Sequence, residues 1–394
     1  MDKNLTNLFF EVAKKVEWED FEILNDSNNA EVNGFLSDFF LVSIRNPISK
    51  DVLHLAVKKA LKNEGRRMET NLTTAYHNEI YFYDTVFPAL KTFLDRKNVT
   101  EQFEFIPRMY ACSKIFGNEV LILENLKILG YQMMDTSLVF NEEQLIYVFM
   151  TYGKLHGLSI SFKEQHPEEY SKIMEKVPHF FLSMEDKTGI SGVMQSAIIA
   201  AFEFVDEDIR TNCHHYISET NKMFWKSMEY KGKYTVLNHG DCWSNNMMFK
   251  YKDKKLESIK LIDFQMITDS SPVYDLSCML YTSARIEDIK NLDKYLKIYY
   301  TTFSNTVKSL GSDPEALLPY EVLKEDWKKY SKFGIQFGIM VHKLKLMDGK
   351  DMLKVGSDDK MWKEVAAIKL TKEKQEIFRE RVKPLEVSYK NGYL

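Results

Sequence analysis

The sequence has few cysteines, no long apolar run and no excess of positive charge. Only four of its 394 residues are cysteine, and they are widely spaced without a CxxC pair, so we expect reduced thiols. The longest apolar stretches, such as 145–150 and 197–202, are far shorter than a bilayer-spanning helix. The 53 basic and 57 acidic side chains give a net charge of -4, which argues against a nucleic-acid binder with a broad cationic surface.

Glycine-rich nucleotide-binding motifs are also absent. Neither a GxxxxGKS/T loop nor a GxGxxG motif occurs, which excludes the common P-loop and dinucleotide signatures. Hydrophobic residues, in contrast, make up 44% of the chain, which is enough for one or two sizeable cores. We therefore expect two lobes or domains.

The first twenty residues mix charged and apolar side chains. Lys3, Glu11 and Lys14 interrupt the apolar positions, so the segment lacks the core of a secretory signal and is predicted to form an amphipathic helix. We expect a soluble, cytoplasmic protein without a membrane span. No pattern bears on the oligomeric state, for which a monomer is the default expectation.

Strand and helix patterns alternate in the first third of the chain. Phe35–Ile44 and Val52–Lys58 are rich in aromatic and aliphatic residues and flank the turn-like Asn46-Pro47, which predicts a β-hairpin. Residues 69–94 predict a long helix in spite of Pro88. Two further strands are predicted at Phe103–Ala111 and Glu119–Leu123. This order suits a small α+β lobe.

From residue 141 onward the sequence is mostly helical. Asn141 and Gln144 form a helix-start pattern, and two short strand patterns follow at Tyr234–Leu237 and Ser258–Ile262. Later helices are predicted at Lys290–Leu310, Tyr320–Met347 and Lys372–Arg381. The expected fold class is therefore α+β, with a small β-sheet lobe containing one long helix and a larger, mainly helical C-terminal lobe.

The residues that suggest chemistry lie between 236 and 276. His239-x-Asp241 is followed five positions later by Asn246, and Asp263 directly follows the apolar strand pattern IKLI. Phosphoryl transfer mainly requires charge to be positioned and neutralised. A carboxylate beside the acceptor hydroxyl takes its proton, while a second carboxylate and an amide oxygen hold Mg²⁺ against the phosphates. We predict Asp241 as the base, with Asn246 and Asp263 as metal ligands.

A kinase also needs a lysine for the α- and β-phosphates. Lys58 closes HLAVK, which is close to the V-A-I-K pattern of kinases, and Glu79 in the following helix is its expected ion-pair partner. Glu64 and Glu69 compete for that role. The alternative is an ordinary charged strand end, but the order of strand, lysine, helix with glutamate and distant His-x-Asp favours the kinase interpretation.

The segment expected to cover the phosphates has little glycine. Residues 34–38 contain only Gly34, where a protein kinase has three glycines. Backbone amides and the Ser37 hydroxyl would therefore have to contact the phosphates.

Several motifs resemble one known family. HGDCWSNNMMF, LIDFQ and SPVYDL are similar to the ecdysteroid kinase-like, or CHK kinase-like, proteins of arthropods and nematodes, which are relatives of choline kinases and aminoglycoside phosphotransferases. HNEIYFYDTVFPAL resembles the long N-lobe helix of that family, VLILENLKILGY its hinge and YGKLHGLS its first C-lobe helix. The resemblance extends over about residues 30 to 350.

The resemblance implies a two-lobed protein-kinase-like fold and a division of the chain. Residues 1–123 would form the N-terminal lobe, 124–130 the hinge and 131–394 the C-terminal lobe. Within the C-terminal lobe, the catalytic loop would span 237–249 and the metal-binding strand end 259–265.

The resemblance also implies roles for single residues. The backbone of Glu124 and Leu126 would bind ATP at the hinge, and Lys58, Asn246 and Asp263 would lie at the phosphates and Mg²⁺. His239 and Asp275 would support the catalytic loop. Asn125 departs from the acidic residue that is common there, but a hinge acts through its backbone.

The acceptor stays open on sequence alone. The family's acceptors are alcohols, with the 22-hydroxyl of ecdysteroids as the named example, and the matched motifs do not carry that specificity. The alternatives are a choline or ethanolamine kinase, an antibiotic phosphotransferase, and a non-catalytic module that binds nucleotide or a lipophilic ligand. Trp243 either lines the acceptor pocket or packs in the core.

Overall fold

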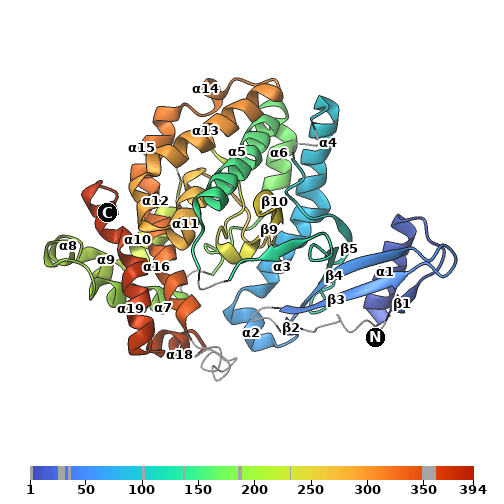
Figure 1. Cartoon of the computed structure of the whole chain (residues 1–394), viewed down its shortest axis with the longest axis horizontal. Coiled ribbons are helices and arrows are strands. Elements are labelled where there is room, and N and C mark those ends of the chain that lie inside the picture. The colour runs from blue at the N-terminus through green and yellow to red at the C-terminus, as the bar shows by residue number, and fades with distance from the viewer. Residues whose placement is uncertain are drawn as a thin grey trace.

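The computed structural model describes residues 3–24, 32–33, 37–99, 103–135, 138–184, 189–230, 232–347 and 361–394. Its N-terminal part is an antiparallel sheet in the order β1-β3-β4-β6-β5, with β2 pairing to the outer part of β3 (Figure 1). The strands are β1 (Glu22–Leu24), β2 (Val32–Asn33), β3 (Ser37–Arg45), β4 (Val52–Ala60), β5 (Met109–Ser113) and β6 (Val120–Glu124).

The predicted amphipathic helix and hairpin are both confirmed. Helix α1 (Lys3–Lys15) buries Leu5, Leu8 and Phe9 in a small core that it shares with the sheet. Strands β3 and β4 pair along their whole length, from Ser37 opposite Ala60 to Arg45 opposite Val52. The turn between them is stabilised by the Asn46 side chain, whose Oδ1 accepts hydrogen bonds from two backbone N–H groups.

The predicted long helix is a rod that stands between the sheet and the C-terminal lobe (Figure 1). It consists of α3 (Leu72–Tyr81), a π-helical turn η1 (Phe82–Val86) and α4 (Phe87–Lys97). The left-handed Asn71 separates it from the short helix α2 (Glu64–Glu69). The π-helical turn directly precedes Pro88, a residue that cannot donate a backbone hydrogen bond.

One predicted strand was wrong in its first six residues. The sequence pattern suggested Phe103–Ala111, but β5 begins only at Met109. Phe103, Phe105 and Ile106 are buried in the core of the C-terminal lobe, so their apolar character reflects packing between the lobes rather than sheet pairing. The Phe105 carbonyl accepts a hydrogen bond from Leu261 N, which attaches this connection to the C-terminal lobe.

The C-terminal lobe contains two small sheets among helices. One has the order β10-β9-β7 and the other pairs β11 with β8. The strands are β7 (Tyr131–Met133), β8 (Val236–Asn238), β9 (Met247–Lys252), β10 (Lys255–Leu261) and β11 (Thr268–Ser270). The hairpin β9–β10 turns at Asp253 and Lys254, both of which have positive φ, as two-residue hairpin turns require.

Helices form the rest of this lobe. Helix α5 begins at the predicted position, with a capping box between Asn141 and Gln144. The predicted helix Tyr320–Met347 is divided at Ser331 into α15 and α16. The main helices are α5 (Glu142–Gln165), α6 (Pro167–Met174), α7 (Ile190–Phe202), α10 (Thr220–Met228), α11 (Val273–Ser283), α13 (Leu292–Ser309), α15 (Tyr320–Tyr330), α16 (Lys332–Leu346) and α19 (Lys372–Val382).

Shorter helices complete the lobe. They are α8 (Glu207–Asn212), α9 (His215–Ser218), the 3₁₀ turn η3 (Ser244–Asn246), α12 (Ile286–Lys290), α14 (Pro314–Leu317), α18 (Met361–Ala367) and α20 (Pro384–Lys390). The predicted α+β architecture, a small sheet lobe followed by a mainly helical lobe, is confirmed. Among the helices in the described residues, none offers an apolar stretch of membrane-spanning length.

Candidate active site

The predicted phosphate-binding lysine lies between two carboxylates from distant parts of the chain. Lys58 Nζ is 2.7 Å from Glu79 Oε2 and 2.7 Å from Asp263 Oδ1. The Glu79 side chain is only 2% exposed, whereas that of Asp263 is 30% exposed. Burial opposes the charged form of Lys58, but the two carboxylates outweigh it and hold its pKa well above the usual value.

The fold explains how Glu79 reaches Lys58. Lys58 lies in the middle of the sheet, opposite Leu121 of β6, and the β4 chain ends two residues later. On α3, Tyr76 and Ile80 pack with Ala60 in one buried cluster, so this face of the helix is pressed against the end of β4. Glu79 follows Tyr76 by three positions and so lies on the same face of α3, where the Tyr76 ring also contacts Lys58. The ion pair therefore depends on both the sheet and the helix.

Asp263 adopts an unusual backbone conformation directly after β10. Its φ is 68°, in the left-handed region that non-glycine residues rarely adopt, at a cost on the order of 1–3 kcal/mol. Its neighbours hold this conformation. The carbonyl of Ile262 is 2.9 Å from His239 Nε2, and the Phe264 ring stacks on Phe82 of the long helix at 3.7 Å between centroids. Strain maintained in this way is typical of functional sites.

Asp241 and Asn246 are joined by two hydrogen bonds. Asn246 Nδ2 donates to the backbone carbonyl of Asp241 at 2.9 Å and to its carboxylate Oδ2 at 2.7 Å. The turn η3 brings them together, and Asn246 O accepts a hydrogen bond from Ile262 N, next to Asp263. Asp241, Asn246 and Asp263, together with Lys58, thus meet in one place.

The surroundings of Asp241 bring the pKa of its own carboxyl close to neutral pH. Burial raises the pKa of Asp241 to about 7, and the negative charge of Asp263 adds to this rise. A carboxylate whose pKa lies near the working pH suits general-base chemistry.

The segment before Asp241 is held by Asp275 at the start of α11. Asp275 Oδ2 accepts from His239 N at 2.7 Å and Oδ1 accepts from Gly240 N at 2.8 Å. His156 Nε2 lies 3.2 Å from the same carboxylate. Burial opposes the charge on Asp275, but the hydrogen bond to His156 lowers its pKa below the usual range. Asp275 is therefore a buried acceptor that orients the loop.

Gly240 is required by this geometry. Its φ is +83°, and a Cβ at this position would lie 1.9 Å from the Met266 carbonyl oxygen. The neighbouring His239 is buried, and burial lowers its pKa, so the ring is neutral and bridges the catalytic loop to Ile262. Gly240 and His239 therefore fix the backbone conformation of the loop and place no functional group on the open face of the site.

The predicted hinge residues connect β6 to β7. Glu124 ends β6, and its Oε1 accepts from Arg108 N at 3.0 Å and lies 3.3 Å from Lys260 Nζ. Leu126 is buried, and its carbonyl accepts from Tyr131 N at 3.0 Å. Its own N–H makes no hydrogen bond to a backbone group of the described residues, which leaves a donor for a nucleotide base.

Ser37 begins β3 opposite Ala60, two residues beyond Lys58 along β4. The rest of the predicted phosphate-covering segment, Gly34 to Leu36, lies outside the described residues. The pairing places Ser37 on the strand next to Lys58.

The described residues that fit a metal ion are few. No group of three or more His, Cys, Asp or Glu that could hold an ion occurs in the part of the chain that the structure describes. Asp263 and Asn246 offer one carboxylate and one amide oxygen, which fits Mg²⁺, because this ion usually keeps waters and substrate phosphates as its other ligands.

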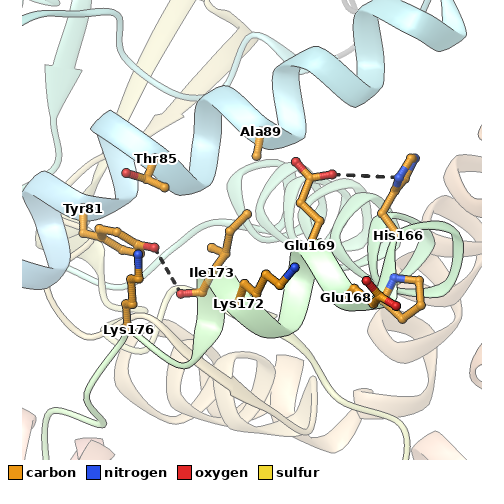
Figure 2. Close-up of a pocket in the computed structure, with 10 residues that line it drawn as sticks. Tyr81, Thr85, Ala89, His166, Glu168, Glu169, Lys172, Ile173 and Lys176 are labelled. Carbon is orange, nitrogen blue, oxygen red and sulfur yellow. Dashed lines mark hydrogen bonds and ion pairs between the residues drawn. The ribbon is translucent and has the colours of Figure 1, made fainter.

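Two large cavities lie elsewhere. Figure 2 shows one of about 680 Å³ between the long helix and α6, with Tyr81, Thr85 and Ala89 on one side and Lys172 and Ile173 on the other. The other, of about 840 Å³, lies behind the hinge and reaches Glu124 and Lys260. Asp241, Asn246 and Asp263 line neither cavity, so the candidate active site was identified from its side-chain geometry.

Sequence reasoning missed two contributors to the site. Phe264 stacks on Phe82 and makes a tilted ring contact with His239. It follows Asp263 as the phenylalanine follows the aspartate in the D-F-G motif of kinases, so it had a detectable signal. Lys345 lies on α16, and its Nζ donates to Ser244 Oγ at 2.9 Å within the catalytic loop. No local pattern indicated this contact, because the two residues are about a hundred positions apart.

Comparisons with solved structures give low sequence identities. The chain is 12% identical to APH(2")-IIia in complex with GDP and kanamycin, with a TM-score of 0.45 and 99% of both chains covered. It is 15% identical to an aminoglycoside-3'-phosphotransferase of type VIII (TM-score 0.30; 82% of this chain and 100% of that chain). It is 12% identical to a glucosamine kinase (TM-score 0.32; 85% and 82%).

A comparison with curated proteins gave no match. A family model, in contrast, matches most of the chain. The model described as the ecdysteroid kinase-like family aligns with residues 31–312, a segment that contains Lys58, Glu79, Asp241, Asn246, Asp263 and Asp275. The chain belongs to the ecdysteroid kinase-like family.

Proposed function

We propose that the protein transfers the γ-phosphoryl group of ATP to a hydroxyl of a small molecule, in the presence of Mg²⁺. One observation carries this proposal. Lys58 and Asp263 form an ion pair at 2.7 Å, and Asn246 is hydrogen-bonded both to Asp241 and, through its backbone carbonyl, to Ile262 next to Asp263. Phosphoryl transfer requires these four chemical types in one place.

Each residue receives a role from its contacts. Asp241 accepts the proton of the acceptor hydroxyl, because its buried carboxyl has a pKa near neutrality. Asp263 and Asn246 hold Mg²⁺, which when bound neutralises charge on the phosphates. Lys58 contacts the α- and β-phosphates and is oriented by Glu79. Because Asp263 is the more exposed of the two carboxylates, it is the one that exchanges Lys58 for a metal ion.

The division of the chain is part of this proposal. Residues 1–123 form the N-terminal lobe, 124–130 the hinge and 131–394 the C-terminal lobe. The backbone of Glu124 and Leu126 binds the adenine ring, and the unpartnered N–H of Leu126 supports this assignment. Ser37, at the beginning of β3, contacts the phosphates. His239 and Asp275 hold the loop that carries Asp241.

An ecdysteroid or another lipophilic alcohol is the acceptor that family membership favours. The experiment is incubation of the protein with Mg²⁺, ATP or GTP, and a mixture of sterols, choline-like amines and xenobiotic alcohols, followed by mass spectrometry for the gain of a phosphoryl group. We expect a phosphorylated alcohol that the Asp241→Asn variant does not produce.

A non-catalytic nucleotide-binding module is the competing function. Thermal stabilisation by nucleotide without any phosphorylated product across the panel would favour that module. It would contradict the kinase proposal, because the assigned base would then have no acceptor to act on. A phosphorylated choline-like amine would instead retain the kinase and overturn the lipophilic acceptor.

A further inference from the structure

A second lysine lies beside the catalytic loop. Lys345 is in the last turn of α16, its Nζ donates to Ser244 Oγ at 2.9 Å, and it is 5.3 Å from the centroid of the Trp243 ring. Ser244 is three residues after Asp241 and is itself buried. The cation is thus held against the part of the loop that joins the predicted base to the predicted metal ligand.

Close packing of α16 fixes the position of Lys345. Gly334 and Gly338 let this helix approach α11, because a Cβ on either would lie within 3 Å of Ser277 or Tyr281. His342 Nε2 also lies 2.9 Å from the Tyr281 carbonyl. Since α11 begins just before Asp275, the same contacts align Lys345 with the loop that Asp275 supports.

Lys345 has few partners for its charge. An ammonium group has three N–H donors, and among the described residues only Ser244 accepts one of them. No carboxylate of the described residues pairs with it. Burial, together with the positive charge of Arg381, lowers its pKa to about 8. Desolvating a cation that has no counter-ion among the described residues is costly, and a bound anion would relieve that cost.

The neighbouring indole offers a second donor. Trp243 Nε1 is buried and has no hydrogen-bond partner among the described residues. Burial raises the pKa of Asp241, and a long hydrogen-bonding contact from the Trp243 side chain opposes this rise, so the indole N–H faces the predicted base. Trp243 therefore contacts Lys345 with its ring and lies beside Asp241, and two N–H donors of Lys345 have no partner among the described residues.

We propose that Lys345 and Trp243 form a binding site for an oxyanionic group next to Asp241. The inference rests on the proposed function and deepens it. The oxyanion is either the transferred phosphoryl group of the nucleotide or a phosphate, sulfate or carboxylate on the acceptor. An acceptor with a cationic amine at this place is disfavoured, because it would face the charges of Lys345 and Arg381.

The chain contains a matched control on the same helix. Lys343 is buried, is paired with no carboxylate of the described residues, and has a pKa lowered by burial. Its Nζ instead donates to Ser196 Oγ at 2.5 Å and to the Ala366 carbonyl at 3.5 Å. It is more deeply buried than Lys345, which is half-buried, and has other partners. The Lys343→Met variant reports what loss of a buried ammonium on α16 does by itself.

Two binding measurements test the proposal without requiring turnover. The first compares the affinities of a non-hydrolysable ATP analogue and of ADP, both with Mg²⁺, so that only the γ-phosphoryl group differs. The second measures thermal stabilisation by sulfate and by inorganic phosphate, with and without saturating MgADP. Both use the full-length protein, the Lys345→Met, Lys345→Arg and Lys343→Met variants, and Lys345→Gln in case the Met variant does not fold.

In one of the two measurements, we expect Lys345→Met to bind the anionic probe about tenfold or more weakly than wild type, because a charged hydrogen bond is removed. Lys345→Arg should retain most of the binding. Loss in the first measurement identifies the transferred phosphoryl group, and loss in the second identifies an anionic acceptor. Equal values for Lys345→Met and wild type in both, or an equal loss in Lys343→Met, would overturn the proposal.

Failure of this inference is distinguishable from failure of the proposed function. If wild type phosphorylates an alcohol and Lys345→Met binds both probes normally, only the oxyanion site is refuted. If wild type binds no nucleotide, the kinase proposal fails, while the sulfate measurement without ADP still reports on Lys345.

Discussion

Two lysines from different lobes lie near the candidate catalytic loop, and they differ in their partners. Lys58 is paired with two carboxylates at 2.7 Å each, which raise its pKa. Among the described residues, Lys345 has one hydroxyl partner and lies over the Trp243 ring, and burial lowers its pKa to about 8. Two carboxylates compensate the charge of Lys58, whereas no carboxylate of the described residues compensates the charge of Lys345. We infer that Lys58 organises the nucleotide side of the site and that Lys345 faces a ligand.

The region between the two lysines is built from backbone constraints. Gly240 and Asp263 both have positive φ, and Asp275 and His239 hold the chain between them. Asp241 lies in this region, where burial raises its pKa and both Trp243 and Lys58 oppose that rise. Variants at Asp241, Lys58 and Asp263 separate the contributions of base, paired cation and metal ligand.

The largest expected effect is on turnover of the Asp241→Asn variant. Asparagine cannot accept the acceptor proton, so turnover should fall by about two orders of magnitude or more. ATP affinity should stay close to wild type, because Asp241 acts on the acceptor. Steady-state kinetics with the identified acceptor and equilibrium titration of ATP check both parts. Normal turnover would refute Asp241 as the base.

A smaller effect is expected for Lys58→Met. The substitution leaves Glu79 and Asp263 as neighbouring carboxylates without their cation, and breaking a buried pair in this way costs about 3–5 kcal/mol as an upper value. Because Asp263 is 30% exposed, solvent screening reduces the actual loss of stability. The melting temperature, measured by thermal unfolding, and the ATP affinity, measured by titration, should both decrease. An unchanged melting temperature together with unchanged ATP affinity would contradict the role of the pair.

Lys58→Met combined with Glu79→Gln sharpens this test. The double variant removes the uncompensated charge of Glu79, so it should recover part of the stability that Lys58→Met loses. It should not recover ATP affinity, because the cation for the phosphates remains absent. Recovery of both properties would assign Lys58 a purely structural role.

The smallest effect concerns the pH dependence of stability. The carboxyl of Asp241 has a pKa of about 7 in the folded protein, against about 3.9 for an unperturbed aspartate. Folding therefore favours the protonated form, and wild type loses stability as pH rises from about 4 to about 7. Asp241→Asn lacks this loss. Its melting temperature minus that of wild type, measured without Mg²⁺, should increase over this range and then level off.

The change of this melting-temperature difference with pH tests the raised pKa of Asp241. A difference between the Asp241→Asn variant and wild type that stays constant from about pH 4 to about pH 8 would show that the Asp241 carboxyl titrates normally in the folded protein. In that case burial would not account for its proposed activity as a base.

Local sequence order predicted much of the fold and of the candidate site. The hairpin β3–β4 and the capped start of α5 follow from turn chemistry and periodicity, which are short-range properties. The spacing of Asp241, Asn246 and Asp263 is also local, because one loop and one hairpin connect all three. Glu79 could be assigned only from its position in a helix after Lys58, with two other glutamates as competitors.

Long-range packing was not predictable in the same way. The strand pattern at Phe103–Ala111 came from apolar residues that are buried against the other lobe, so periodicity alone could not separate the two environments. Lys345 reaches Ser244 only because Gly334 and Gly338 let α16 approach α11. No property of residues 332–346 by themselves indicates which loop their last turn will contact.

The most direct test concerns the proposed metal ligand. ATP binding is measured by calorimetry with and without Mg²⁺ for wild type and for Asp263→Asn, a substitution that the left-handed conformation tolerates. We predict that Mg²⁺ strengthens ATP binding to wild type, and that the variant loses most of this gain while binding metal-free ATP at least as tightly. The same Mg²⁺ dependence in both proteins would contradict the account.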